Sequence, residues 1–311
     1  MDFGGFLVFD RSYSKTARML LAVGGAGALL LSGCAQNTEE GASPATDETT
    51  AVEVTKVDEI AATLPEKNVS SGTLVVGVNV PYSPNEFKDS SGKIVGFDVD
   101  LMNAVAGVLG VTAQYEEADF DRIIPSIQGG TYDVGMSSFT DTREREQTVD
   151  FATYFNAGTQ WAQQTGGSVD PTDACGLKVA VQTTTIQDQE EVPAKSEACV
   201  AAGKPAIQIE KYDSQDDAVN ALVLGRVDAM SADSPVTAYA IKQTGDKLEA
   251  AGDVFDSAPY GYPVAKGSPL AATLQQAVQH LIDNGQYQTI AENWGVEAGV
   301  IEESQINGAV N

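Results

Sequence analysis

The chain has 311 residues, of which 42% are apolar and 20% charged, a composition typical of a globular protein with a sizeable core. Its 44 acidic and 18 basic residues give a formal net charge of −26, so nucleic acids and anionic lipid headgroups are poor electrostatic partners. The single histidine, His280, and three cysteines offer no spacing typical of a metal site. We therefore expect no metal and no cofactor in a chain long enough for about two domains.

The N-terminal residues have the composition of an export signal. A basic region precedes the apolar run 19–31, which is too short to span a bilayer stably. The run ends in LSGC at 31–34, which looks like a bacterial lipobox with a lipid attached at the thiol of Cys34. We predict a lipoprotein signal peptide over 1–33 and a lipid-anchored protein on the outer face of the cytoplasmic membrane. The alternative is a short transmembrane anchor with an incidental cysteine.

The segment after Cys34 predicts a connection rather than a core. Residues 35–50 are rich in Thr, Glu, Ala and Ser and have almost no large apolar side chain. Residues 57–68 have weak helical character, which Pro65 interrupts. We assign 34–70 to a flexible tether and an N-terminal extension.

From residue 74 onward, apolar strands and amphipathic helices alternate, as in parallel α/β sheets. The predicted strands are 74–78, 112–116, 132–137, 177–181, 206–210, 227–230 and 261–265. The predicted helices are 98–109, 121–128, 186–198, 214–224, 234–243, 268–283 and 285–293. The alternation breaks over 151–164 and 256–260, which indicates two crossovers between two α/β lobes. We predict 71–157 plus 258–311 as lobe 1 and 158–257 as lobe 2.

Two cysteines lie close together within the predicted lobe 2. Cys175 and Cys199 form an even pair in an exported protein, so we expect a disulfide between them. The alternative is two free thiols.

One motif points to a family. The run GFDVDLMNAVAGVL at 96–109 predicts a turn at Gly96, an N-cap at Asp98 and an amphipathic helix. It also resembles the signature of the polar-amino-acid family (family 3) of ABC-transporter solute-binding proteins. The resemblance implies a periplasmic-binding-protein-like fold of type II, an α/β fold in which a two-strand hinge joins two lobes around a ligand cleft.

The first candidate site follows the strand at 74–78, because ligands of open α/β sheets bind beyond the carboxyl ends of strands. The prolines of the loop 79–87 stiffen it around Tyr82. The resemblance implies that Tyr82 and Phe120 are aromatic walls of the ligand site, with Asn79 near the ligand side chain. Two rings can enclose an aliphatic stem or cover a cation. The alternative is that both rings only fill space in the core.

The second candidate site is the segment 136–143. A strand ends there in polar residues at a predicted helix start, where oriented N–H groups bind anions. An arginine fork can grip a carboxylate with two bonds. The resemblance implies that Ser138 and Arg143 hold the ligand carboxylate, with Gly135 at an adjacent backbone contact. The alternative is a surface helix with a solvated arginine.

The third candidate site belongs to lobe 2. The resemblance implies that the loop with Gln182 and Thr185 completes the carboxylate site, although three threonines stand where many relatives have glycines. It also implies that Asp233 takes the ligand ammonium. An aspartate between a strand and a helix start can instead be an ordinary N-cap.

Together these groups predict a receptor for a zwitterion rather than an enzyme, with no catalytic residue. Because Asn79 carries no charge, glutamine or another neutral polar amino acid fits best, while arginine and lysine stay open. The predicted function is delivery of that amino acid to the permease subunits of an ABC importer. The alternatives are an enzyme similar to cyclohexadienyl dehydratase on the same fold and a sensor for a signalling partner.

Overall fold

The computed structural model describes residues 52–310. They belong to one compact unit. The predicted signal peptide over 1–33, the lipidation site Cys34 and the tether over 35–50 lie outside the described residues. Within 52–310, every helix is too short or too polar to cross a lipid bilayer.

The strands of this unit form one large mixed sheet and one small ribbon. In chain order they are β1 (Thr73–Val78), β2 (Phe87–Lys88), β3 (Ile94–Val95), β4 (Thr112–Glu117), β5 (Val134–Gly135), β6 (Val149–Gln164), β7 (Lys178–Gln182), β8 (Gln208–Tyr212), β9 (Ala229–Asp233) and β10 (Leu248–Ala265). The 8-stranded sheet has the order β4-β1-β5-β10-β6-β9-β7-β8, and β2 pairs with β3. β1 is parallel to β4 and β5, β7 is parallel to β8 and β9, and β6 is antiparallel to β10.

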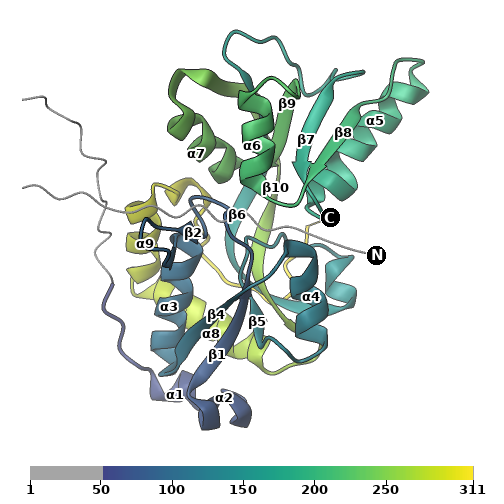
Figure 1. Cartoon of the computed structure of the whole chain (residues 1–311). Coiled ribbons are helices and arrows are strands. Elements are labelled where there is room, and N and C mark those ends of the chain that lie inside the picture. The colour runs from purple at the N-terminus through teal and green to yellow at the C-terminus, as the bar shows by residue number, and fades with distance from the viewer. Residues whose placement is uncertain (1–51, 311) are drawn as a thin grey trace, which may run out of the picture. The chain divides into compact units, whose positions relative to one another are not determined.

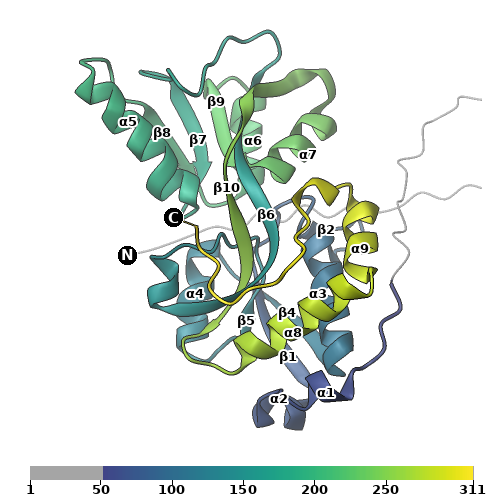
Figure 2. The ribbon, with the colours of Figure 1, turned by 180° about the vertical axis from the view of Figure 1, so that it is seen from behind.

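Helices cover both faces of the large sheet. They are α1 (Asp58–Ala61), α2 (Glu66–Ser71), α3 (Phe97–Leu109), α4 (Phe120–Gln128), α5 (Val192–Ala201), α6 (Gln215–Val223), α7 (Ser234–Thr244), α8 (Leu270–Asp283) and α9 (Gln286–Trp294). Figures 1 and 2 show α3, α8 and α9 on one side of β1 and α4 on the other. At the other end of the sheet, α5 lies opposite α6 and α7. This is the layered arrangement that the alternation of strands and helices predicts.

Two long strands, β6 and β10, lie at the centre of the sheet order, run through both lobes and join them (Figure 1). The predicted architecture of two α/β lobes joined by two strands is therefore confirmed. We propose to place the lobe boundaries where the sequence predicts them, with 71–157 and 258–311 in lobe 1 and 158–257 in lobe 2. The hydrophobic clusters support this division, because two of them draw only on residues of 158–257 and the other two draw none from it.

The N-terminal extension packs on lobe 1. The weak helical pattern over 57–68 corresponds to α1 and α2. Val54 and Ile60 pack against the lobe 1 core, and the Val57 N–H donates to the carbonyl oxygen of Val108 at 2.9 Å. Residues 52–70 are thus held by apolar contacts and by the backbone of α3.

The structure differs from the sequence prediction at the crossovers. The predicted strand 261–265 is only the end of β10, which also includes the predicted break at 256–260. Its pairing with β6 shifts register several times, and both Gly252 and Asp256 have positive φ. These irregularities remove the alternation by which a strand is recognised in sequence.

Two further elements differ from the prediction. The strand over 132–137 is reduced to β5. The helix over 186–198 is divided into a π-helical turn at Gln187–Glu191 and α5. Pro193, in the first turn of α5, has no N–H to donate to the carbonyl four residues earlier, so a regular α-helix cannot continue through it unbroken.

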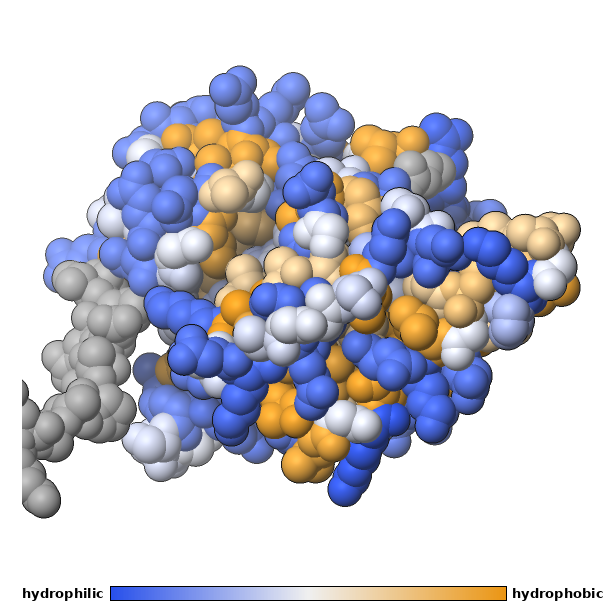
Figure 3. Space-filling model, turned by 90° about the horizontal axis from the view of Figure 1, so that it is seen from above, coloured by the Kyte–Doolittle hydropathy of each residue, from blue (hydrophilic) through white to orange (hydrophobic). Residues whose placement is uncertain are grey.

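The face shown in Figure 3 is largely hydrophilic, with apolar side chains gathered in patches between the polar ones. It belongs to a chain whose formal net charge is −26. Charge of one sign spread over a surface favours solvation and opposes binding to other anions.

A disulfide joins Cys175, which precedes β7, to Cys199 in α5, and the two Cα atoms are 5.5 Å apart. Closing a loop of this length stabilises a fold by about 3 kcal/mol in the chain-entropy model.

We expect reductant to lower the free energy of unfolding in urea by about that amount. The Cys175→Ser/Cys199→Ser double variant is the control and should not respond to reductant. Equal responses of the two proteins would contradict a stabilising role for this bond.

Candidate functional site

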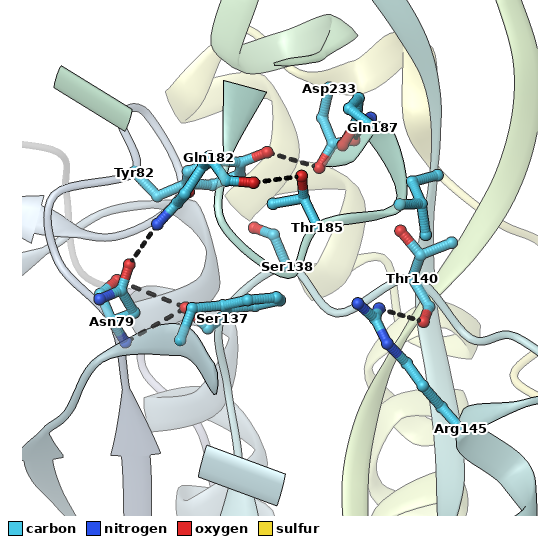
Figure 4. A pocket seen from close by; sticks show the side chains of 12 residues that line it. Asn79, Tyr82, Ser137, Ser138, Thr140, Arg145, Gln182, Thr185, Gln187 and Asp233 are labelled. Atoms are coloured by element: carbon cyan, nitrogen blue, oxygen red, sulfur yellow. Dashed lines mark hydrogen bonds between the residues drawn. The ribbon is translucent and has the colours of Figure 1, made fainter. Parts of the chain in front are cut away.

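A small pocket, lined mostly by polar residues, lies between the two lobes. Its lining residues come from lobe 1 and lobe 2, and Figure 4 labels most of them. They are Asn79, Tyr82, Phe120, Ser137, Ser138, Thr140, Arg145, Gln182, Thr185, Ile186, Gln187 and Asp233. Except for Gly135 and Arg143, all of the predicted ligand-binding residues are among them.

Asn79 follows β1 and is fixed by both lobes. Its Nδ2 donates to the carbonyl oxygen of Ala118 at 3.0 Å, and its Oδ1 accepts from Nε2 of Gln182 at 2.9 Å. Its backbone N–H donates to Oγ of Ser137 at 3.2 Å. The Asn79–Gln182 bond therefore joins lobe 1 to lobe 2 at one end of the pocket (Figure 4).

Tyr82 reaches across the pocket from the loop after β1. Its N–H donates to the carbonyl oxygen of Glu86 at 2.7 Å, which closes the loop. The ring is buried, and its hydroxyl donates to Oδ2 of Asp233 at 2.7 Å. Tyr82 thus forms a second polar contact between the lobes.

Asp233 ends β9 and collects three hydrogen bonds. Its Oδ2 accepts from the hydroxyls of Tyr82 and Tyr260, each at 2.7 Å, and its Oδ1 accepts from Nε2 of Gln187 at 2.8 Å. Its side chain makes no capping hydrogen bond to α7, so the N-cap alternative does not describe its contacts. Burial raises the pKa of Asp233, while these hydrogen bonds and the nearby guanidinium of Arg145 lower it again.

The arginine of the pocket is Arg145, and the prediction of Arg143 is wrong in this respect. Arg143 is exposed and does not line the pocket. The N–H of Arg145 donates to Oγ1 of Thr142 at 3.2 Å, at the start of a 3₁₀ turn. This turn directs the third residue after Thr142 back toward the pocket, whereas Arg143 lies on its outer side. A threonine whose hydroxyl accepts from the N–H three residues later is a known local capping pattern. In the sequence, this pattern was the signal that could have pointed to Arg145 instead of Arg143.

The guanidinium of Arg145 is held without an ion pair. Its Nη1 donates to the carbonyl oxygen of Thr140 at 2.8 Å and its Nη2 to that of Thr184 at 3.1 Å. Its Cζ lies 5.6 Å from the ring centre of Phe120 and 5.7 Å from that of Phe139. None of the ion pairs within 52–310 includes Arg145. Burial lowers its pKa, and a cation in such a place is stabilised by an anion.

The segment before Arg145 is held by the C-terminal end of the described chain. Oδ2 of Asp141 accepts from the N–H of Gly308 at 2.7 Å, and Oε1 of Glu146 accepts from that of Ala309 at 3.2 Å. Burial and the Glu146 carboxylate raise the pKa of Asp141 to about 7. The two acids therefore tie the turn that positions Arg145 to a distant part of the sequence.

Two residues of the predicted motifs have other roles in the structure. Gly135 lies buried in β5, where a Cβ would be 2.8 Å from Cγ of Pro263, so this glycine allows close packing. Asp98 is not the N-cap, a position that Gly96 occupies with φ of 141°. A Cβ on Gly96 would overlap the carbonyl oxygen of Asn85. The glycine thus lets α3 begin against the loop after β1, and Asp98 is buried in its first turn.

Sequence reasoning missed several lining residues, namely Ser137, Thr140, Arg145, Ile186 and Gln187. Gln187 is the most informative of them, because its amide holds Asp233 and also donates to Oγ1 of Thr159 at 3.2 Å. It projects from the π-helical turn, a feature that is frequent at functional sites and has no clear sequence signal.

Comparisons with known proteins identify the family of this chain. Arginine-binding protein ArgT of Corynebacterium glutamicum is 43% identical over 279 residues, covering 89% of this chain and 91% of ArgT. A solved ancestral arginine-binding protein bound to arginine has a TM-score of 0.66 and 36% identity, covering 72% of this chain and 98% of its own. An ancestral arginine-binding protein bound to glutamine has a TM-score of 0.66 and 37% identity, covering 73% of this chain and 99% of its own. Residues 74–297 match the profile of one family, and the chain belongs to it: the bacterial extracellular solute-binding proteins, family 3.

Proposed function

We propose that this protein binds L-arginine, and L-glutamine more weakly, and delivers the amino acid to an ABC importer. The observation that carries the proposal is the pairing of Arg145 and Asp233 in one pocket. Each is charged in its ordinary state, and neither has an ion pair among the described residues. A free α-amino acid carries one carboxylate and one ammonium, which are the charges that these two residues neutralise.

The neighbouring groups of the pocket can bind the remaining parts of an amino acid. Arg145 would take the carboxylate with help from hydroxyls of the lining threonines, and Asp233 would take the ammonium. The rings of Tyr82 and Phe120 would enclose the aliphatic part of the side chain. Because the groups come from both lobes, binding would favour the closed arrangement of the lobes.

The far end of the pocket decides between side chains. Asn79 and Gln182 present neutral amides, which can accept hydrogen bonds from a guanidinium or exchange them with a glutamine amide. The hydrogen-bonding groups at this end suit both ligands. The 43% identity to a protein named for arginine supports arginine as the preferred one.

Calorimetry on the purified chain tests this proposal with four ligands. L-arginine should bind more tightly than L-glutamine, and L-glutamate should bind weakly because the pocket already contains Asp233. Agmatine, which is arginine without its carboxylate, should not bind measurably because it leaves Arg145 unpaired. Tighter binding of glutamine than of arginine would restore the preference predicted from Asn79, and the absence of binding by any amino acid would overturn the proposal.

We also propose that Cys34 is the acylated N-terminus of the mature protein and holds it on the outer face of the membrane. The support is the LSGC run at 31–34 after a short apolar segment. Mass spectrometry of membrane-extracted protein should find a lipid-modified Cys34, and a Cys34→Ala variant should lose that modification. An unmodified Cys34 in the membrane fraction would contradict the anchor without affecting the ligand proposal.

A further inference from the structure

Two acids without a cation lie directly behind the pocket. Glu86, from the loop after β1, and Asp98, from the first turn of α3, are both 0% exposed. None of the ion pairs found within 52–310 includes either residue. The two side chains meet at the hydroxyl of Ser138, whose Oγ lies 3.5 Å from Oε2 of Glu86 and 3.3 Å from Oδ2 of Asp98. Burying two carboxylates side by side is unfavourable unless a proton or a cation is present.

The pair holds two serines that line the pocket. Oγ of Ser137 donates to Oε1 of Glu86 at 3.0 Å. The N–H of Ser138 donates to Oδ2 of Asp98 at 3.1 Å, and its Oγ lies 3.3 Å from the same oxygen. Ser138 has φ of 50°, a left-handed conformation that a serine keeps only where its surroundings enforce it. The acids therefore fix the backbone at the floor of the site.

The hydrogen bonds around Asp98 leave a place for one proton between the two acids. Oδ2 of Asp98 also accepts from the hydroxyl of Tyr154 at 2.5 Å, whereas Oδ1 of Asp98 is buried and has no hydrogen-bond partner among the described residues. A proton on Glu86 would satisfy this oxygen. The other titratable groups facing the pair are phenols, namely Tyr82, Tyr115, Tyr154, Tyr262 and Tyr287.

The electrostatics of burial agree with this arrangement. Burial and the charge of Asp98 raise the pKa of Glu86 well above its ordinary value. Burial raises the pKa of Asp98 to about 6, against hydrogen bonds from Tyr154 and Glu86 that lower it. Both shifts disfavour two charged carboxylates side by side and favour one proton held by the pair.

We propose that Glu86 and Asp98 are positioning residues of the amino-acid site, and that one proton shared between them holds Ser137 and Ser138 in their binding geometry. Glutamine at position 86 keeps a donor toward Asp98 and an acceptor for Ser137, so it imitates the protonated acid. Alanine at position 86 removes both. Comparing Glu86→Gln with Glu86→Ala therefore shows whether the site needs the hydrogen bonds of a protonated acid at position 86.

The first test needs no ligand and measures unfolding in urea between pH 6.5 and 8.5. In the folded protein Glu86 keeps its proton, whereas in the unfolded chain it has lost it. The unfolding equilibrium constant of the native protein should therefore increase about tenfold per pH unit relative to Glu86→Gln. Glu59→Gln, which removes an exposed charge on α1, is the matched control and should follow the native protein. Parallel curves for the native protein and Glu86→Gln would overturn the shared proton.

The second test rests on the proposed function and measures arginine affinity at pH 7. Glu86→Gln should stay within about threefold of the native protein, and Glu86→Ala should lose about tenfold or more, because buried polar groups then lack partners. Equal losses in both variants, or native affinity in Glu86→Ala, would overturn the positioning role. If the native protein bound no amino acid, the proposed function would fail, while the unfolding test would still decide whether the proton is shared.

Discussion

Arg145→Ala is expected to lose amino-acid binding, whereas Arg143→Ala should bind as the native protein does. Removing Arg145 leaves the ligand carboxylate in a buried place without its charged partner, which typically costs about 2–5 kcal/mol. This corresponds to a loss of affinity of roughly 30-fold to several thousand-fold. Arg143 is exposed and does not line the pocket, so water and salt screen its charge and it contributes little to ligand affinity.

Arg145→Lys should also bind weakly, because an ammonium cannot reproduce the planar fork that donates to Thr140 and Thr184. Calorimetry with L-arginine measures all three variants. Since Arg145 also packs over Phe120 and Phe139, thermal unfolding of each variant must confirm that it is folded. Native affinity in Arg145→Ala, or a loss in Arg143→Ala as large as that in Arg145→Ala, would refute the assignment of the anchor to Arg145.

Asp233→Asn is expected to weaken every amino acid by a similar factor, because all of them share the α-ammonium. The loss should again be about 2–5 kcal/mol, since a neutral amide cannot replace the charge that faces the ammonium. The asparagine oxygen can still accept from the hydroxyls of Tyr82 and Tyr260, so the variant should fold.

The affinity of the native protein should also fall in acid, because burial raises the pKa of Asp233 and protonation removes its charge.

A ligand without the amino group provides the control. 5-Guanidinopentanoate, which is arginine without its α-ammonium, should bind the native protein and Asp233→Asn with similar weak affinity. The two changes remove the same contact, so their effects should not add. Additive losses would show that Asp233 acts on the site by another route, such as the loop of Tyr82.

Much of the fold could be predicted because its cause is local. β1 is a short apolar run, and α3 has apolar side chains at helical spacing that form one buried face. The two crossover strands were harder, since β10 bends at Gly252 and Asp256 and shifts its pairing with β6. A pattern that relies on regular alternation cannot describe a strand whose register changes along its length.

The site, too, was predictable only in part from the sequence. Asn79, Tyr82 and Asp233 lie at or just after the ends of strands, so their place at one edge of the sheet could be predicted from chain order. Arg143 and Arg145 are two residues apart, and their charge and size are the same. The turn at Thr142 decides which one faces the pocket, and that turn is itself held by contacts with Gly308 and Ala309 at the other end of the chain.

The sequence by itself determined the α/β class, the two lobes and the family resemblance, because these depend on periodicity, strand ends and short motifs. Only the tertiary structure decided which arginine lines the pocket and why Asp98 is buried. Asp98 accepts a hydrogen bond from Tyr154, which is 56 residues away in sequence, and shares the hydroxyl of Ser138 with Glu86, because Gly96 lets α3 begin against the loop after β1. Contacts of this kind depend on how separate elements pack, and no local pattern of residues encodes them.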